Sequence, residues 1–258
     1  MFRLSEEEME IAKTCRNGRF FWKNIYGAPL DTSGDTANSM NENPELGSLW
    51  KGRILMQIIA EKTEKPVRRV QPIPQEDVEM ARQYTVYRKF SLMFQINQAI
   101  ALPKEDSEFE VVVRVAECEF TTGRPVICKG LFNRYNYRLD PKNSELVLPY
   151  VNVADIGSIF IYLRQKVGLT GKMANIAYFR APVLEFTETD PQSLRWVELQ
   201  PDLAVGEITE AYKAGLVGIR LSIHDETANG PINWPSIPFW KSKVKKRPGN
   251  VKVRAYIF

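Results

Sequence analysis

The chain has few of the residues on which most catalytic and metal sites depend. Its 258 residues include one histidine and three cysteines. Cys15, Cys118 and Cys128 are widely spaced and lack the CxxC pairs of a zinc site, so we expect free thiols in a reducing, cytoplasmic compartment. His224 has no nucleophile motif around it. We therefore predict that the chain is not an enzyme and has no catalytic residue.

Long apolar runs and a strong net charge are also absent. No apolar run approaches the roughly 20 residues that a membrane-spanning helix needs, and Met1 is followed by charged residues rather than by a secretory signal. The 35 basic and 31 acidic residues give a net charge of +4, which is too balanced for a dedicated nucleic-acid binder. We expect no nucleic-acid partner, and any charged partner must bind a local patch.

The first third of the chain alternates short ordered patterns with loops. A capping box at Ser5 and Glu8 predicts a short helix. The aromatic stretch RFFWKNIYGAPL is predicted to be core rather than a membrane wedge, residues 31–48 a polar loop, and residues 52–59, GRILMQII, a strand. EKTEKPVRRVQPIPQ has the composition of a linker, and QEDVEMARQY after Pro74 that of another short helix.

From Arg88 onward the pattern is that of short β-strands. In KFSLMFQI the alternate residues from Phe90 to Ile96 are apolar, which predicts one buried face. Seven more strand-like segments follow: FEVVVRVAECEF, VICKGLFNRYNYRL, ELVLPYVNV, SIFIYLRQK, NIAYFRAPVLEF, RWVEL and GLVGIRLSIHD. Short strands at nearly even spacing, without long helices between them, predict an all-β fold, an antiparallel eight-stranded β-sandwich with short helices.

The order of several segments resembles one protein family. Segments similar to WKNIYGAPL, LGSLWKGRILMQI, KFSLMFQINQAIALPKEDSEFEVVVRV, LVLPYVNVADIGSIFIYLRQK, NIAYFRAPVLEF and NVKVRAYIF occur in this order in the middle of ferlins, the membrane-trafficking proteins with several C2 domains. The resemblance is colinear over nearly the whole chain and depends on this order rather than on one motif. It implies a C2-like sandwich in a cytoplasmic protein of vesicle fusion and exocytosis, peripheral to membranes, whose parent is membrane-anchored.

The resemblance also implies a division of the chain. Residues 1–64 would close a preceding C2 domain, 65–83 would be a linker with a short helix, 84–226 a complete C2-like module, 227–250 a basic, aromatic and proline-rich linker, and 251–258 the first strand of a following C2 domain. The chain would then be a fragment of a longer protein, with neighbouring C2 domains as partners. Animal ferlins often carry a long helical insert between YLRQK and NIAYFRAP, which VGLTGKMA replaces here.

Calcium-binding C2 domains hold the ion between loops at one end of the sandwich, and Ca²⁺ needs about six to eight oxygen ligands. One candidate loop offers Glu105, Asp106 and Glu108. The facing loop, RQKVGLTGKMANI, has no carboxylate. It carries basic side chains instead: Arg164, Lys166 and Lys172. We therefore predict a calcium-independent module with no metal site and no cofactor.

Two groups of basic residues are candidate lipid-binding sites. The first follows the aromatic and proline-rich INWPSIPFW: Lys241, Lys243, Lys245, Lys246 and Arg247. The second follows from the resemblance, because C2 domains can bind phosphoinositides on a basic concave sheet: Arg134, Arg138 and Arg164, with Tyr135 and Tyr137. Each cation near an anionic leaflet contributes on the order of 1 kcal/mol, and aromatic rings settle at the interface.

The first group also has a structural interpretation, as a solvated linker with Trp234, Phe239 and Trp240 packed back on the sandwich. Two functions follow from these alternatives. In one, the module is an architectural spacer that holds neighbouring C2 domains at a set distance. In the other, it is a peripheral module that binds anionic phospholipids through its basic patches without calcium.

Overall fold

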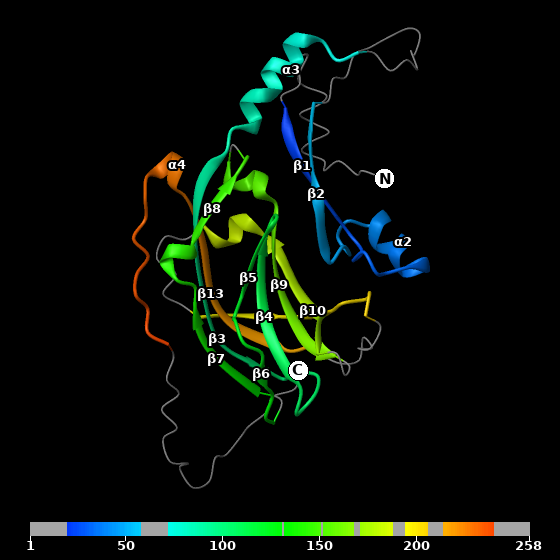
Figure 1. Cartoon of the computed structure of the whole chain (residues 1–258), viewed down its shortest axis with the longest axis vertical. Coiled ribbons are helices and arrows are strands. Elements are labelled where there is room, and N and C mark those ends of the chain that lie inside the picture. The colour runs from blue at the N-terminus through cyan, green and yellow to red at the C-terminus, as the bar shows by residue number, and fades with distance from the viewer. Residues whose placement is uncertain are drawn as a thin grey trace, which may run out of the picture.

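The computed structural model describes residues 20–57, 72–130, 132–150, 152–167, 171–187, 194–205 and 214–239. Antiparallel strands form two sheets and a separate two-stranded hairpin (Figure 1). The strands are β1 (Phe21–Gly27), β2 (Leu49–Met56), β3 (Arg88–Ile100), β4 (Glu108–Val115), β5 (Cys118–Thr121), β6 (Val126–Ile127), β7 (Phe132–Arg138), β8 (Glu145–Leu148), β9 (Ser158–Val167), β10 (Lys172–Pro182), β11 (Arg195–Glu198), β12 (Gln200–Pro201) and β13 (Leu216–Asp225). The helices are α2 (Gly34–Glu42), α3 (Gln75–Arg82) and α4 (Glu226–Asn229), with 3-10 turns η1 (Gln83–Thr85), η2 (Pro141–Asn143), η3 (Val153–Ile156) and η4 (Val183–Phe186).

The first sheet has the strand order β12-β10-β9-β4-β5, and β6 pairs with the start of β4. Aromatic and β-branched residues, which fit a pleated sheet well, fill its two central strands. The segment FEVVVRVAECEF was predicted as one strand, but it forms both β4 and β5. The chain reverses at Ala116, whose φ of 49° is left-handed, and the Arg114 side chain donates to the Ala116 carbonyl at 2.9 Å.

The second sheet has the order β11-β13-β3-β7, and β8 pairs with the start of β3. The alternation predicted for β3 is confirmed, because Phe90, Leu92, Phe94 and Ile96 all lie in the main core. The register shifts between Ile96 and Gln98, and Ala99 returns to the core beyond this irregularity.

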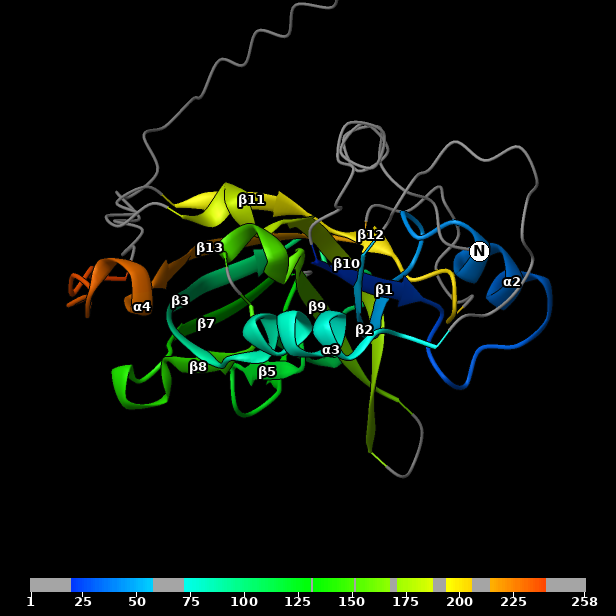
Figure 2. The same cartoon turned by 90° about the horizontal axis from the view of Figure 1, so that it is seen from above.

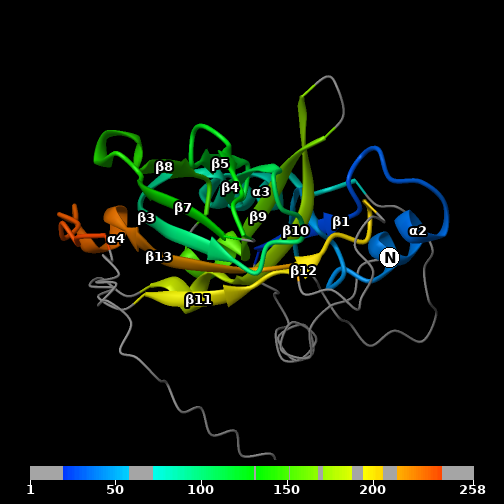
Figure 3. The ribbon, with the colours of Figure 1, turned by 90° about the horizontal axis from the view of Figure 1, so that it is seen from below.

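The main core lies between the two sheets. Phe94 of β3, Phe109 of β4 and Ile161 of β9 are fully buried there, and burying one such side chain contributes about 1.5–3 kcal/mol. Figures 2 and 3 show the two sheets as stacked layers. The antiparallel, C2-like β-sandwich predicted from the sequence is thus confirmed.

Residues 20–57, here called the hairpin, comprise β1, α2 and β2 and pack on the outer side of the first sheet. The predicted polar loop between the two strands was wrong in part, because it contains α2. Met40 is the only buried residue of the helix and its only large apolar one, so its sequence shows no apolar periodicity. The hairpin contacts the sandwich, while the assignment of residues 1–64 to a preceding C2 domain stays a prediction.

Residues 230–239, here called the strap, follow α4 and run along the outer side of the second sheet. The hairpin with α2 and the turn at α4 lie on opposite sides of the molecule (Figures 2 and 3). The helix predicted after Pro74 is confirmed as α3. The predicted helix at Ser5 and the predicted strand at 251–258 lie outside the described residues.

Candidate functional site

The structure separates the basic residues that the sequence predicts as lipid-binding. The first group lies outside the described residues: Lys241, Lys243, Lys245, Lys246 and Arg247. Arg134 and Arg138 lie on β7 of the second sheet, whereas Arg164 lies on β9 of the first. The structure therefore does not bring Arg164 together with the other two arginines, because sequence proximity does not show which sheet a strand joins.

The two tyrosines that were expected to join this patch point into the sandwich. The ring of Tyr137 lies 5.7 Å from that of Phe94, and the Tyr135 hydroxyl donates to the Phe109 carbonyl at 3.3 Å. Burial raises the pKa of Tyr135. Successive residues of a strand face opposite sides, so β7 presents its arginines outward and these tyrosines inward.

Arg164 lies on the outer side of the first sheet within a set of paired charges. Its guanidinium donates to Asn175 at 2.7 Å and to Glu119 at 3.0 Å, and it lies 3.9 Å from Glu110. Because its charge is offset by two carboxylates, it adds little to any attraction of an anionic surface.

The carboxylates considered for calcium lie at the start of β4. Glu108 accepts a hydrogen bond from Lys166 at 2.9 Å, so a basic side chain faces this loop as predicted. Asp106 has a left-handed φ of 54°, and its amide donates to the Cys128 carbonyl at 3.1 Å. Within the described ranges, no three His, Cys, Asp or Glu side chains gather as a metal site. Calcium independence stays a prediction.

The strap is held at its start by groups on β3 and β13. The Trp234 indole donates to the Ser91 hydroxyl at 2.8 Å, and Nε2 of His224 lies 3.0 Å from the Gly230 carbonyl oxygen. The rings of His224 and Trp234 meet edge to face at 6.3 Å. The only histidine of the chain thus contacts the strap, and Trp234 packs back on the sandwich, as the linker interpretation predicted.

Arg138 holds the other end of the strap. Its guanidinium donates to the Ser236 hydroxyl at 3.1 Å and to the Ile237 carbonyl, and it lies 5.5 Å from the centre of the Phe239 ring. The residue predicted to bind lipid therefore binds the chain's own continuation.

The strap crosses a surface of β3, β7 and β13 that we call the outer polar face. Its members are outward-facing residues of these strands: Ser91, Met93, Gln95, Asn97, Gln98, Arg134, Arg138, Gly218, Arg220, Ser222 and His224. Most are covered, and Gln95 and Ser222 are 1% and 0% exposed. Arg138, Gln95 and Arg220 lie side by side in one row across the strands. Burial and the nearby charge of Arg138 lower the pKa of Arg220.

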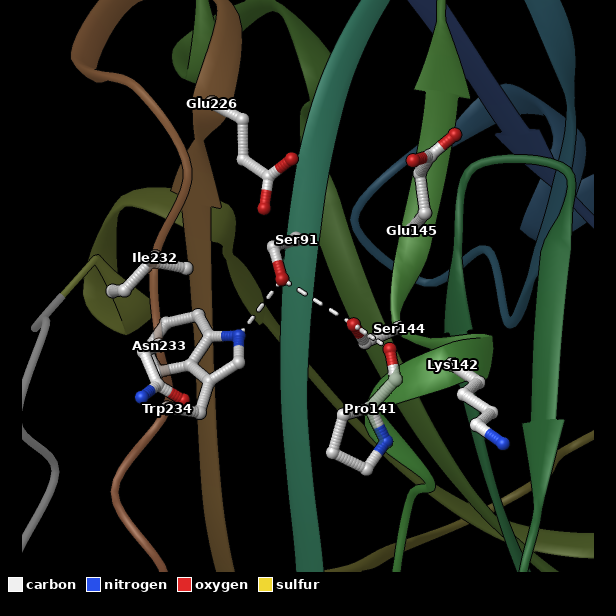
Figure 4. A pocket seen from close by; sticks show the side chains of 9 residues that line it. All are labelled: Ser91, Pro141, Lys142, Ser144, Glu145, Glu226, Ile232, Asn233 and Trp234. Atoms are coloured by element: carbon white, nitrogen blue, oxygen red, sulfur yellow. Dashed lines mark hydrogen bonds between the residues drawn. The ribbon is translucent and has the colours of Figure 1, made fainter.

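A pocket of about 340 Å³ lies beside the strap (Figure 4). The strap lines it with Ile232, Asn233 and Trp234, and the sandwich lines it with Ser91 and with residues around η2 and α4. Figure 4 shows the indole nitrogen directed at Ser91, whose hydroxyl also lies 3.4 Å from that of Ser144. The strap therefore leaves space beside its main aromatic anchor.

The hairpin covers a second surface, here called the outer aromatic face. This face consists of Val112, Phe160, Tyr162 and Tyr178 on the first sheet. Tyr26 of the hairpin lies 5.7 Å from the ring of Phe160, which stacks on Tyr162 at 5.6 Å. Together with Tyr26 these residues form an apolar cluster outside the main core.

Arg180 is enclosed where the hairpin meets this face. Its guanidinium lies 3.8 Å from the centre of the Tyr26 ring and donates to the carbonyls of Pro44 and Gly47. Burial lowers the pKa of Arg180. A cation over an aromatic face in a desolvated site contributes about 2 kcal/mol, so Arg180 holds the hairpin through charge as well as shape.

Backbone and side-chain hydrogen bonds complete this interface. The Tyr162 hydroxyl donates to the Ser48 carbonyl at 2.7 Å, and the Ser48 hydroxyl donates to Asp202 at 3.1 Å. Asp202 is 3% exposed, and its Oδ2 has no hydrogen-bond donor in the described part of the chain. Burial raises the pKa of this carboxyl group.

The Cys118 thiol is not activated. Cys118 is half-buried and Cys128 is buried, and neither forms a disulfide bond within the described ranges. Burial raises the pKa of the Cys118 thiol, which lowers the thiolate fraction on which reactivity depends. Within the described ranges, no helix combines the length and the apolar character needed to cross a bilayer.

Sequence reasoning missed the residues that attach the strap and the hairpin, above all Ser91 and Arg180. Ser91 is one polar residue of an alternating strand, and Arg180 is a single cation in an apolar run. A weak signal was present for the hairpin, because SIFIYL is apolar on both faces of its strand. Such continuous runs are typical of strands that are covered on both sides.

No protein-family model and no curated protein sequence matches the chain. Many solved structures are similar to it, and three examples, all at low identity, follow. CC2D1B, described as coordinating ESRCT-III activity during the mitotic reformation of the nuclear envelope, is 10% identical, with a TM-score of 0.38 over 57% of this chain and 70% of that chain. A structure of extended-synaptotagmin 2 that contains its SMP domain and two C2 domains is 16% identical, with a TM-score of 0.37 over 76% of this chain and 36% of that chain.

The third structure, PLC21 of L. pealei, is 14% identical, with a TM-score of 0.34 over 54% of this chain and 16% of that chain. This chain thus spans only a small part of the last two proteins. Its own sheet order and core define it as a C2-like β-sandwich module.

Proposed function

We propose that this chain is a non-enzymatic, calcium-independent C2-like module of a ferlin-like membrane-trafficking protein, and that it acts as an architectural spacer. One observation carries the proposal: segments that precede and follow the sandwich pack onto its two outer sides. A module whose outer faces are occupied by its own flanking chain fixes the directions in which that chain enters and leaves. Neighbouring C2 domains of the same protein are the partners such a spacer would hold.

The order of segments shared with ferlins supports the choice of family, and with it a role in vesicle fusion and exocytosis in the cytoplasm, peripheral to membranes. The hairpin carries the first part of that order. Its docking through Tyr26 and Arg180 makes the segment that enters the module part of one rigid unit with the sandwich, which a spacer requires.

Distances between pairs of spin labels test this rigidity. Nitroxide labels would be placed at Ile54 on β2 and Val147 on β8, which are 40% and 47% exposed, after replacement of the native cysteines by alanine. We expect one narrow distance distribution, because the hairpin is fixed. A Tyr26→Ala, Arg180→Ala double variant should broaden it.

A label pair within the sandwich, at Ile127 on β6 and Val147 on β8, is the matched control and should stay narrow in both proteins. A broad distribution for the hairpin pair in the unmodified chain would show that the hairpin does not stay on the sandwich. The spacer proposal would then be wrong.

A second candidate function, binding of anionic phospholipids, is favoured by a different observation. The outward-facing residues of β3, β7 and β13 include Arg134, Arg138 and Arg220 and no Asp or Glu. Such a face attracts anions, and the basic run from Lys241 to Arg247 follows, in sequence, the strap that covers it.

Co-sedimentation with neutral vesicles and with vesicles containing phosphatidylserine and phosphoinositide separates the two candidates. A lipid-binding module should bind only the anionic vesicles, with calcium or with chelator, and less at high salt because ions screen the attraction. Replacement of the five basic residues from Lys241 to Arg247 by glutamine should then abolish binding. A pure spacer binds in no condition.

A further inference from the structure

Arg138 is held by neutral groups. Its acceptors on the strap are the hydroxyl of Ser236 and the carbonyl of Ile237, and the Phe239 ring lies near its charge. A phosphate group offers two charged oxygens that match the guanidinium fork, and such bidentate pairs are stronger than bonds to neutral acceptors. A phosphate group therefore binds the Arg138 guanidinium more strongly than the neutral acceptors of the strap do.

The surroundings of Arg138 favour an anion. Gln95 separates Arg138 from Arg220 in the same row, and the positive field of Arg138 adds to burial in lowering the pKa of Arg220. Arg134 lies further along β7, opposite Gln98. The strap supplies no carboxylate to this row, because residues 230–239 contain no Asp or Glu.

The strap itself is lightly held. Ile237 is its only buried residue, and Pro231, Asn233, Ser236 and Pro238 are exposed. A pocket of about 340 Å³ lies between Trp234 and residues of the sandwich. By contrast, the strands beneath it belong to the main core. The strap can therefore leave the surface without unfolding the sandwich.

We propose that the strap is a releasable cover of the outer polar face, and that an anionic phospholipid surface displaces it by taking over Arg138. The inference rests on the lipid-binding candidate above and adds its regulation. The basic run begins at Lys241, two residues after Phe239 at the end of the strap. Arg134 and Arg138 on the uncovered face and the basic run that follows the strap in sequence then act on one membrane together, which is how stable peripheral attachment is commonly achieved.

Two variants should move lipid binding in opposite directions. Trp234→Ala removes the indole anchor and should release the strap. Ser236→Asp puts a carboxylate at the position whose hydroxyl now lies 3.1 Å from the Arg138 guanidinium, and it should hold the strap more firmly. Apparent affinity scales with the open fraction, so a strap that is docked about nine-tenths of the time limits the gain in Trp234→Ala to about tenfold. Ser236→Asp should weaken binding several-fold.

The measurements are co-sedimentation of the full chain with phosphatidylcholine vesicles, with and without phosphatidylserine and phosphoinositide, and hydrogen exchange of residues 230–239. Asn233→Asp is the matched control for Ser236→Asp, because it adds the same charge to an exposed strap residue that does not bond to Arg138 in the structure. Tyr87→Ala, at a side chain 61% exposed, controls for loss of an aromatic ring. Both controls should leave exchange of the strap unchanged, and Ser236→Asp should weaken vesicle binding more than Asn233→Asp does.

Several results would overturn the inference. If Trp234→Ala exchanges faster in the strap but binds anionic vesicles no more tightly than the parent chain, the strap does not control binding, although the lipid-binding function stands. If strap exchange does not change in that variant, Trp234 is not its anchor. Equal weakening by Asn233→Asp and Ser236→Asp would show simple charge repulsion. If no variant binds any vesicle, the lipid-binding function itself fails, and its regulation with it.

Discussion

The two outer sides of the sandwich are both covered by the chain's own flanking segments, but by different physical means. On the first sheet the hairpin buries an aromatic cluster and encloses the Arg180 guanidinium. On the second sheet the strap lies over mainly polar side chains and is held mainly by one hydrogen bond from Trp234 and two from Arg138. The first contact resembles a protein core, and the second resembles a surface that binds an exchangeable ligand.

The difference originates in the strands beneath each cover. The central strand of the first sheet, β9, is apolar on both faces through IFIYL, so that face cannot be left in water without exposing large rings. The central strand of the second sheet, β3, carries mostly polar residues on its outer side, with Met93 as the exception, so exposure of that side to water would uncover few apolar groups. Continuous apolar strands thus require a permanent cover, whereas alternating strands permit a removable one.

The largest expected effect comes from the aromatic face. Phe160→Ala removes a side chain that is 1% exposed and contacts rings from the hairpin and from its own sheet. If this face is a second core, the free energy of unfolding should fall by about 3–5 kcal/mol, as for Phe→Ala in an interior. Denaturation in urea, followed by circular dichroism, measures the change.

Two further variants provide reference values for the loss of unfolding free energy expected of Phe160→Ala. Phe94→Ala in the main core should cost about the same 3–5 kcal/mol, and Gln95→Ala on the outer polar face only about 1 kcal/mol, the usual net worth of a hydrogen bond. A cost below about 1 kcal/mol for Phe160→Ala would mean that the aromatic face gains little from its cover. The two outer sides of the sandwich would then not differ in how much their covers contribute to stability.

Alanine substitutions at two glycines compare the attachment of the hairpin with the attachment of the strap. Gly157 and Gly230 have left-handed φ values of 84° and 78°. A Cβ on Gly157 would lie 2.7 Å from Nδ2 of Asn24 and closer still to the Tyr26 hydroxyl, whereas a Cβ on Gly230 meets nothing within 4 Å. Alanine at Gly230 should therefore cost only backbone strain, about 1–3 kcal/mol.

Alanine at Gly157 should cost at least about 1 kcal/mol more, because it also forces the hairpin away from the sandwich. The excess should appear as faster hydrogen exchange in β1, with little change in the strap. Equal costs for the two alanines, with β1 exchange unchanged, would show that the hairpin adjusts freely at Gly157. The hairpin would then be attached to the sandwich no more rigidly than the strap is.

Much of the fold could be predicted from the sequence because its signals are local. The alternation in β3 and the helix after Pro74 depend on neighbours in sequence, and both are present. The break between β4 and β5 was missed because Ala116 adopts a left-handed φ of 49° without the usual glycine. Helix α2 was missed because a single apolar residue, Met40, anchors it.

The candidate site could be predicted less well, because it depends on which strands lie side by side. Arg138 and Arg220 are far apart in sequence and meet across Gln95 only through strand register. Arg164 is closer to Arg138 in sequence, yet lies in the other sheet. The composition of the strap showed that its aromatics could pack back on the sandwich, but not that Arg138 would hold it.

The smallest expected effect concerns the pH dependence of the hairpin attachment. Burial raises the pKa of Asp202 above its ordinary value of 3.8, and the nearby charge of Asp31 adds to the shift. A raised pKa means that the folded chain favours the protonated carboxyl, so this contribution to stability is fully present below pH 3.8 and is lost as the pH rises through the pKa of the folded state. Asp202→Asn removes the titration.

The free energy of unfolding of Asp202→Asn, relative to the unmodified chain, should therefore rise as the pH is raised from below 3.8 and level off toward neutrality. Ser48→Ala sharpens the test: the Ser48 hydroxyl donates to the carboxylate and lowers its pKa, so its loss should shift the pH dependence of the parent chain further upward. A difference between Asp202→Asn and the parent that stays constant with pH would show that water reaches Asp202 in solution. The hairpin would then admit water at Asp202, although its aromatic contacts exclude water nearby. In that case only the packing of the rings would distinguish the permanent cover from the removable one.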